Sequence, residues 1–152
     1  MLTLQLPDES ATLALGTQLA IYCPQQQFSI YLEGELGAGK TTLVRGLLHK
    51  LGHLGKVKSP TYTLIERYKT ARKIVHHFDL YRLLDPLELD YLGLDEYFQS
   101  QNLCLIEWPQ QGEGYLPTPD IKLKLIYSGE QRIAQLTPLS AEGKTLCSKL
   151  DK

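Results

Sequence analysis

Residues 34–41, with the sequence GELGAGKT, match the pattern of a phosphate-binding loop, in which a glycine and four further residues precede Gly-Lys-Thr. Residues 28–32, just before the loop, are a β-branched, aromatic and apolar run of strand length. Residues 42–48 follow the loop with apolar side chains at helical spacing. A strand, a glycine loop and a helix in this order predict that the chain binds the phosphates of a nucleotide. A glycine-rich turn before a helix is the alternative interpretation.

The residue types inside the loop suit an anionic ligand. Its three glycines allow a tight turn whose backbone N–H groups are directed inward. Lys40 supplies a positive charge for the outer phosphates, and the hydroxyl of Thr41 is a ligand type that Mg²⁺ accepts. The expected cofactors are therefore a nucleoside triphosphate and Mg²⁺.

The composition argues against several other classes of protein. With 152 residues, of which 43 % are hydrophobic, the chain is expected to form a single domain, residues 1–152. A net charge of −1 argues against DNA binding and against direct RNA binding, because both need an excess of basic side chains. The three cysteines are far apart, and no signal-peptide pattern or membrane-spanning apolar run is present in the sequence. These features favour a cytoplasmic protein.

Apolar patterning and turn residues predict the order of strands and helices. Helices are predicted after an N-cap at Asp8, from the loop to about Leu51, from Asp85 to about Gln99 with a break at Gly93, and over residues 140–150. Strands are predicted at residues 2–6, 28–32, 61–68, 73–79, 103–106, 121–127 and 132–137. Short turns join the third strand to the fourth and the sixth to the seventh, so both pairs are expected to be hairpins. The predicted fold is an α/β, P-loop NTPase-like three-layer sandwich with a mixed central sheet.

Two acidic residues at strand ends are candidates for the chemistry. A nucleotide hydrolase needs a carboxylate that organises its metal and a group that aligns water. Glu107 follows the apolar run 103–106, where a magnesium-organising carboxylate is expected, and Asp79 ends the strand 73–79. An ordinary strand-end acid is the alternative for each.

Neighbouring residues allow two interpretations each. Thr61, in the hydroxyl-rich segment 59–63, is either a sensor of the γ-phosphate or a residue that opens a strand. Trp108 directly follows Glu107 and either packs near the nucleotide or belongs to the core. His76 and His77 are adjacent in one strand and therefore face opposite sides of the sheet, so both are interpreted as structural.

The sequence favours a protein partner over a small-molecule substrate. It contains no guanine-reading Asn-Lys-x-Asp motif, and Arg132 is the only arginine after Trp108, whereas small-molecule kinases of this fold use an arginine-rich lid. The acidic stretch between Leu83 and Leu103 is either a solvated face or a docking surface. A nucleotide-dependent binding module and a P-loop small-molecule kinase remain alternatives to an ATPase that acts on a partner.

Four stretches in order, residues 34–42, 57–64, 77–83 and 105–109, resemble the TsaE (YjeE) family of ATPases in bacterial tRNA threonylcarbamoyladenosine biosynthesis. The resemblance implies a protein that binds ATP and hydrolyses it weakly with Mg²⁺. It also implies an accessory role for the TsaD–TsaB complex, which attaches threonylcarbamoyl to the adenosine beside the anticodon. Contact with tRNA is expected only indirectly, through that complex.

The resemblance also implies roles for single residues. Asp79 is expected to support hydrolysis, together with Lys40 and Thr61, while Thr41 and Glu107 are expected to hold Mg²⁺. Besides Trp108, the residues expected to contact the nucleotide are Glu9, Gly37, Ala38, Gly39, Lys40, Thr41, Thr42 and Arg132.

Overall fold

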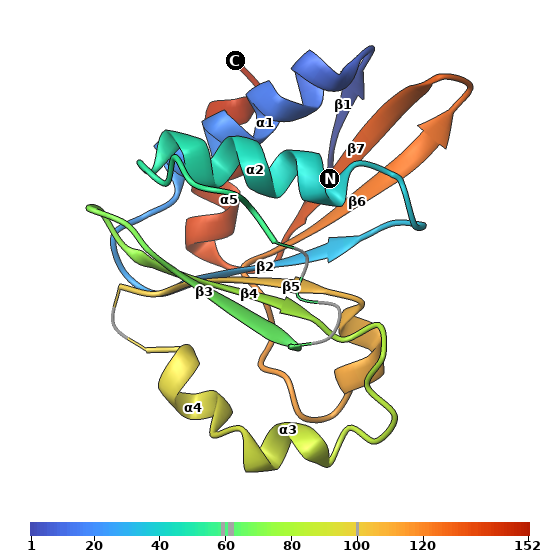
Figure 1. Cartoon of the computed structure of the whole chain (residues 1–152). Coiled ribbons are helices and arrows are strands. Elements are labelled where there is room, and N and C mark those ends of the chain that lie inside the picture. The colour runs from blue at the N-terminus through green and yellow to red at the C-terminus, as the bar shows by residue number, and fades with distance from the viewer. Residues whose placement is uncertain (59, 61–62, 100) are drawn as a thin grey trace.

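The structure is a computed structural model that describes residues 1–58, 60, 63–99 and 101–152. In this part of the chain, seven strands form one sheet in the spatial order β1-β7-β6-β2-β5-β4-β3 (Figure 1). The strands are β1 (Leu2–Leu6), β2 (Phe28–Glu33), β3 (Ile65–Lys69), β4 (Ile74–Asp79), β5 (Leu103–Glu107), β6 (Ile121–Ser128) and β7 (Gln131–Pro138).

The sheet is mixed, as predicted. Strand β2 pairs in parallel with β5 and β6, and β4 pairs in parallel with β5. The pairs β1–β7, β3–β4 and β6–β7 are antiparallel, and the last two are the predicted hairpins. Their turns are too short for the crossover that a parallel pair requires. Gly129 in the second turn has a φ of 65°, a conformation that favours glycine.

Helices cover both faces of the sheet, which confirms the predicted three-layer sandwich (Figure 1). On one face lie α1 (Glu9–Tyr22), α2 (Lys40–Lys50) and α5 (Ala141–Leu150). On the other face lie α3 (Glu88–Tyr91) and α4 (Leu94–Tyr97), and the 3-10 helix η1 (Pro109–Gly112) follows β5. The core is divided in the same way, with a large apolar cluster under α1, α2 and α5 and a smaller one on the side of α3 and α4.

Helices α1 and α2 pack backbone against backbone. A Cβ on Gly16 would lie 2.2 Å from the carbonyl oxygen of Leu43, and a Cβ on Gly46 would lie 2.4 Å from that of Leu13. Only glycine permits this approach, because any side chain would overlap the neighbouring helix. The contact holds α2, and with it the end of the glycine-rich loop of residues 34–41, against α1.

The predicted helix ends agree with the structure in most places. The Asp8 side chain accepts a hydrogen bond from the N–H of Ala11 at 2.9 Å, so it caps α1 as predicted. Gly52 follows the C-cap of α2 with a φ of 106°, and Gly93 separates α3 from α4 with a φ of 66°. None of the described helices is long and apolar enough to cross a lipid bilayer.

Two predicted elements begin three or more residues later than expected. Strand β3 begins at Ile65, not at residue 61, because Leu64 has a φ of 67° and leaves the extended conformation; residues 59, 61 and 62 lie outside the described part. The helix predicted from Asp85 begins at Glu88, because Asp85 instead forms a turn and accepts hydrogen bonds from the N–H groups of Leu87 and Glu88.

Candidate functional site

The glycine-rich loop, residues 34–41, which was predicted to bind phosphates, connects the end of β2 to the start of α2. Gly34, Gly37 and Gly39 have φ values of 147°, 80° and 109°, so each occupies a conformation that side chains disfavour. Gly39 is the N-cap of α2, and Lys40 is its first residue. Backbone N–H groups at a helix N-terminus carry a partial positive charge, which makes this point of the fold suited to an anion.

Asp79 and Glu107 meet beside the loop because their strands are neighbours. Strands β4 and β5 are parallel, and the register pairs Asp79 directly with Glu107. Both carboxylates are almost fully buried. They line one cavity of about 430 Å³ together with Thr41, Lys40 and Trp108. The structure therefore brings together the loop and both predicted acids, which are far apart in the sequence.

Lys40 is held by the site itself. Its Nζ donates a hydrogen bond to the carbonyl oxygen of Gly34 at 2.5 Å and lies 4.0 Å from Oε1 of Glu107. The same ammonium group lies 4.4 Å from the centroid of the Trp108 ring, a cation–π contact. Burial lowers the pKa of the Lys40 ammonium, and the nearby carboxylates of Glu107 and Asp79 act in the opposite direction.

Asp79 carries the opposite shift. Burial raises the pKa of the Asp79 carboxyl above its usual value, and Glu107 raises it further. A hydrogen bond from the N–H of Tyr81 to Oδ1, at 3.0 Å, works in the other direction because it stabilises the ionised form. Asp79 is thus a carboxyl group that accepts a proton more readily than an exposed one.

Trp108 belongs to the wall of this cavity. Its backbone is in the left-handed region, with a φ of 55°, and its ring lies 4.9 Å from the ring of Tyr81. The residue also packs against the smaller apolar cluster. Trp108 thus contacts the core on one side and lines the cavity on the other, and its packing near a nucleotide stays a prediction.

A second, smaller cavity of about 180 Å³ lies on the other side of the loop. It is lined by Glu9, Thr42 and Arg132 together with loop residues 37–39. The Arg132 guanidinium lies 4.1 Å from the centre of the Tyr127 ring, and the Tyr127 hydroxyl donates a hydrogen bond to the carbonyl oxygen of Leu36. The structure therefore places Glu9 and Arg132, predicted from outside the main motifs, beside the loop.

One contact at the site was not predicted from the sequence. His77 was interpreted only as structural, but its Nε2 lies 2.5 Å from Oε2 of Glu107, and the ring is fully buried. His76 does face the other side of the sheet, as expected, and stacks edge-on against Tyr97. The missed signal was alternation, because His77 and Asp79 are two residues apart and must share a face. Thr61 lies outside the described residues, so its role stays a prediction.

The donors at this site suit one hard cation. Among the described residues, no three His, Cys, Asp or Glu side chains are grouped closely enough to hold a metal by themselves. Mg²⁺ does not require such a group, because it keeps several waters and is usually bound through one or two carboxylates and the phosphates of a substrate. The Thr41 hydroxyl and the Glu107 carboxylate, which line the same cavity, are oxygen donors of this kind.

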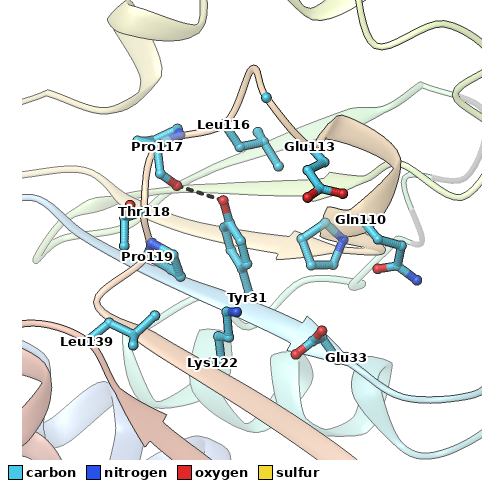
Figure 2. A pocket seen from close by; sticks show the side chains of 12 residues that line it. Tyr31, Glu33, Gln110, Glu113, Leu116, Pro117, Thr118, Pro119, Lys122 and Leu139 are labelled. Atoms are coloured by element: carbon cyan, nitrogen blue, oxygen red, sulfur yellow. Dashed lines mark hydrogen bonds between the residues drawn. The ribbon is translucent and has the colours of Figure 1, made fainter.

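A third cavity, of about 370 Å³, is lined by strand residues Tyr31, Glu33 and Lys122 and by the segment around Pro117 (Figure 2). Tyr31 points into it and donates a hydrogen bond to the carbonyl oxygen of Pro117 at 2.6 Å. Burial raises the pKa of the Tyr31 hydroxyl to about 12. None of the predicted site residues that the structure describes lines this cavity, and the carboxylates of Glu33 and Glu113 make it a poor place for a phosphate.

Comparisons with known proteins agree with this geometry. The family model "Threonylcarbamoyl adenosine biosynthesis protein TsaE" matches residues 6–134. Proteins named tRNA threonylcarbamoyladenosine biosynthesis protein TsaE are similar to the chain: that of Haemophilus influenzae is 45 % identical over 97 % of this chain and 96 % of its own length. That of Bacillus subtilis is 38 % identical over 80 % of this chain and 76 % of its own length.

A solved structure is similar to the whole chain. The crystal structure of Bacillus subtilis YdiB superposes with a TM-score of 0.81 and 30 % identity, covering 99 % of this chain and 93 % of that one. The match of the family model, the identity to the curated relatives and the shared fold all agree with the four ordered motifs. The chain therefore belongs to the TsaE family.

Proposed function

We propose that this chain binds ATP and hydrolyses it slowly with Mg²⁺, in the service of tRNA threonylcarbamoyladenosine biosynthesis. The observation that carries the nucleotide part is the cavity in which Lys40, Thr41, Asp79 and Glu107 meet at the N-terminus of α2. Family membership and the names of the curated relatives support the pathway.

Each residue has a definite part in this proposal. Loop residues 37–42 surround the phosphates, and Lys40 exchanges its bond to the Gly34 carbonyl for a bond to a phosphate oxygen. Thr41 and Glu107 hold Mg²⁺, which when bound neutralises charge on the phosphates. Asp79 would support hydrolysis by orienting the attacking water or by supporting the metal that Thr41 and Glu107 would hold, and its raised pKa suits a group that accepts a proton. Trp108 borders the cavity that contains Lys40 and Asp79, and Glu9 and Arg132 border the smaller cavity on the other side of the loop.

The proposed partners are the proteins TsaD and TsaB. The net charge of −1 fits a chain that reaches tRNA only through a protein complex, in the cytoplasm where tRNA is modified. Two alternatives stay in view: a binding module in which ATP sets a conformation and its hydrolysis is incidental, and a small-molecule kinase.

The first experiment compares Lys40→Ala with Lys50→Ala. Both lysines belong to α2, but Lys50 is exposed at its far end. Loss of a hydrogen bond from a charged group costs about 1.5–3 kcal/mol, so Lys40→Ala is expected to weaken ATP binding by roughly 10-fold to 100-fold in calorimetry. Lys50→Ala is expected to bind ATP normally. Wild-type hydrolysis by Lys40→Ala would refute the assignment of the site.

The second experiment separates the alternatives. Asp79→Asn is expected to keep ATP binding and to lose roughly 10²–10⁴-fold in phosphate release. The family resemblance implies that a further protein, TsaC, makes the activated threonylcarbamoyl-adenylate. In a modification assay with TsaC, TsaB, TsaD and tRNA, this variant should fail after the first turnover if hydrolysis drives the cycle. It should support repeated turnover if nucleotide binding alone is sufficient. A phosphorylated acceptor other than water would favour the kinase.

A further inference from the structure

His77 lies where the site meets the interior of the sheet. It is on β4, two residues before Asp79, and its ring is fully buried. In the ladder it pairs with Leu105, while Asp79 pairs with Glu107, so His77 reaches Glu107 along the diagonal between neighbouring strands. Side chains at such diagonal positions on one face are within reach of each other. The imidazole is not among the residues that line the cavity, so it contacts Glu107 from the buried interior.

The surroundings of the ring select one tautomer. Nε2 lies 2.5 Å from Oε2 of Glu107, so a hydrogen on Nε2 can be donated to this carboxylate oxygen. Nδ1 is buried and has no hydrogen-bond partner among the described residues. A hydrogen on Nδ1 would leave an unpaired donor inside the protein. It would also place the lone pair of Nε2 against a lone pair of Oε2 of Glu107. The neutral ring with its hydrogen on Nε2 avoids both penalties.

The two oxygens of Glu107 have different neighbours. Oε2 contacts His77, and Oε1 lies 4.0 Å from Nζ of Lys40 at the wall of the cavity. The side chain of Glu107 is only 7 % exposed, so few waters compete for these contacts. The bond from His77 fixes the rotation of the carboxylate and leaves Oε1 on the side of the cavity.

From this arrangement we propose that His77 is a positioning residue: it orients the Glu107 carboxylate so that Oε1 is available to Mg²⁺. The proposal rests on the proposed function, since it concerns the same site. Hydrogen bonds to the ligands of a metal orient those ligands, and their loss typically costs 10-fold to 100-fold in metal affinity.

The chain itself offers a matched control. His76 is the adjacent residue, is equally a buried histidine, and faces the other side of the sheet, where it contacts Tyr97. His77→Gln retains an N–H donor close to the position of Nε2, whereas His77→Leu removes it. The comparison of His77→Leu, His77→Gln and His76→Gln therefore distinguishes a lost hydrogen bond from a disturbed core.

The first measurement needs neither nucleotide nor metal. Nitrogen-15 NMR of the histidine side chains in the full chain is expected to show His77 with its hydrogen on Nε2 and a bare Nδ1. Glu107→Ala is expected to shift the Nε2 signal. A hydrogen on Nδ1 of His77 would overturn the proposal, and this outcome is independent of whether the protein hydrolyses ATP.

The second measurement is the Mg²⁺ concentration that gives half-maximal ATP hydrolysis, with nucleotide binding measured separately in EDTA. His77→Leu is expected to raise this concentration 10-fold to 100-fold while nucleotide affinity in EDTA changes less than 2-fold. His77→Gln is expected to restore most of the loss, and His76→Gln is expected to leave the Mg²⁺ requirement unchanged.

Equal defects in His77→Gln and His77→Leu would reduce His77 to a packing role. If His77→Leu does not fold, a wild-type Mg²⁺ requirement in His77→Gln supports the proposal and a 10-fold rise overturns it. If the wild-type chain neither binds nor hydrolyses ATP, the proposed function fails, but the NMR result still decides the contact with Glu107.

Discussion

The two faces of the β4–β5 ladder carry different kinds of side chain, although the same strands form both. The face toward α2 ends in His77, Asp79 and Glu107, which are buried and polar. The face toward α3 and α4 carries Phe78 and Ile106, and the His76 ring there contacts the ring of Tyr97. Because side chains alternate along a strand, the polar residues of the candidate site lie on one face and apolar packing residues lie on the other.

The helices on the two faces also pack differently. Helix α2 touches α1 through backbone atoms at Gly16 and Gly46, which cannot move aside. On the other face, the three atoms nearest to a Cβ added at Gly112 would be methyl carbons of Leu80, Leu89 and Leu116. An added methyl group would therefore meet backbone atoms between α1 and α2, whereas at Gly112 it would meet side chains that can adjust. The predictions below test this contrast.

The largest effect is expected from adding one methyl group to each face. Gly46→Ala places a Cβ 2.4 Å from a backbone oxygen and should destabilise the protein by about 3 kcal/mol, even though alanine is the better helix former. Gly112→Ala meets flexible side chains and should cost about 1 kcal/mol. Urea denaturation measures both. Equal losses would remove the contrast between the two faces.

The next effect concerns His76 on the supporting face. Burial, with Arg67 as the second cause, lowers the pKa of His76 to about 4. The unfolded chain, with a pKa near 6.5, then binds the proton more tightly than the folded chain, so stability is lost as the pH falls from about 6.5 to 4. His76→Phe can keep the ring contact with Tyr97. As the pH falls over this range, the free energy of unfolding of this variant should decrease by about 1–2 kcal/mol less than that of the wild type. Urea titrations at several pH values measure the stability of both proteins. If wild type and His76→Phe lost the same stability between about pH 6.5 and pH 4, His76 would not be the group that titrates.

A smaller effect of opposite sign is expected at Asp79 on the other face. Burial is the main cause that raises the pKa of Asp79 in the folded protein, so the ionised carboxylate opposes folding. This penalty develops as the pH rises, first through the pKa of Asp79 in the unfolded chain and then through its pKa in the folded protein. Asp79→Asn keeps an acceptor for the N–H of Tyr81 and should make the nucleotide-free protein more stable at pH 7, by up to about 1 kcal/mol. The gain should vanish toward acidic pH. A loss of stability at pH 7, measured by thermal unfolding, would mean that Asp79 is held by stronger contacts than its burial.

The smallest effect is expected at the surface pair Glu9–Arg45. The two groups are 2.8 Å apart, but both side chains are substantially exposed. Glu9→Gln should therefore change the stability of the nucleotide-free protein by less than about 0.5 kcal/mol, and added salt should reduce the difference further. A larger change in thermal unfolding would show that the contact between α1 and α2 depends on charge as well as on glycine packing.

Elements that depend on near neighbours were predictable from the sequence. The strand–loop–helix around Lys40, the cap at Asp8 and the hairpin at Gly129 each follow from residues a few positions apart. Predictions were wrong where a single backbone conformation or local hydrogen bond interrupted a favourable pattern. Leu64 in the left-handed region delays β3, and the turn at Asp85 delays α3.

The sequence by itself determined the strand, glycine-rich loop and helix around Lys40, the mixed α/β fold and membership of the TsaE family, because these depend on local order and on recognisable motifs. Only the tertiary structure decided that Asp79 and Glu107 pair across neighbouring strands, that Lys40 rests between Gly34 and Trp108, and that His77 contacts Glu107. The physical reason is strand register. Alternation assigns each side chain to a face, but the alignment of β4 with β5 sets which side chains meet, and that alignment depends on the packing of the whole sheet.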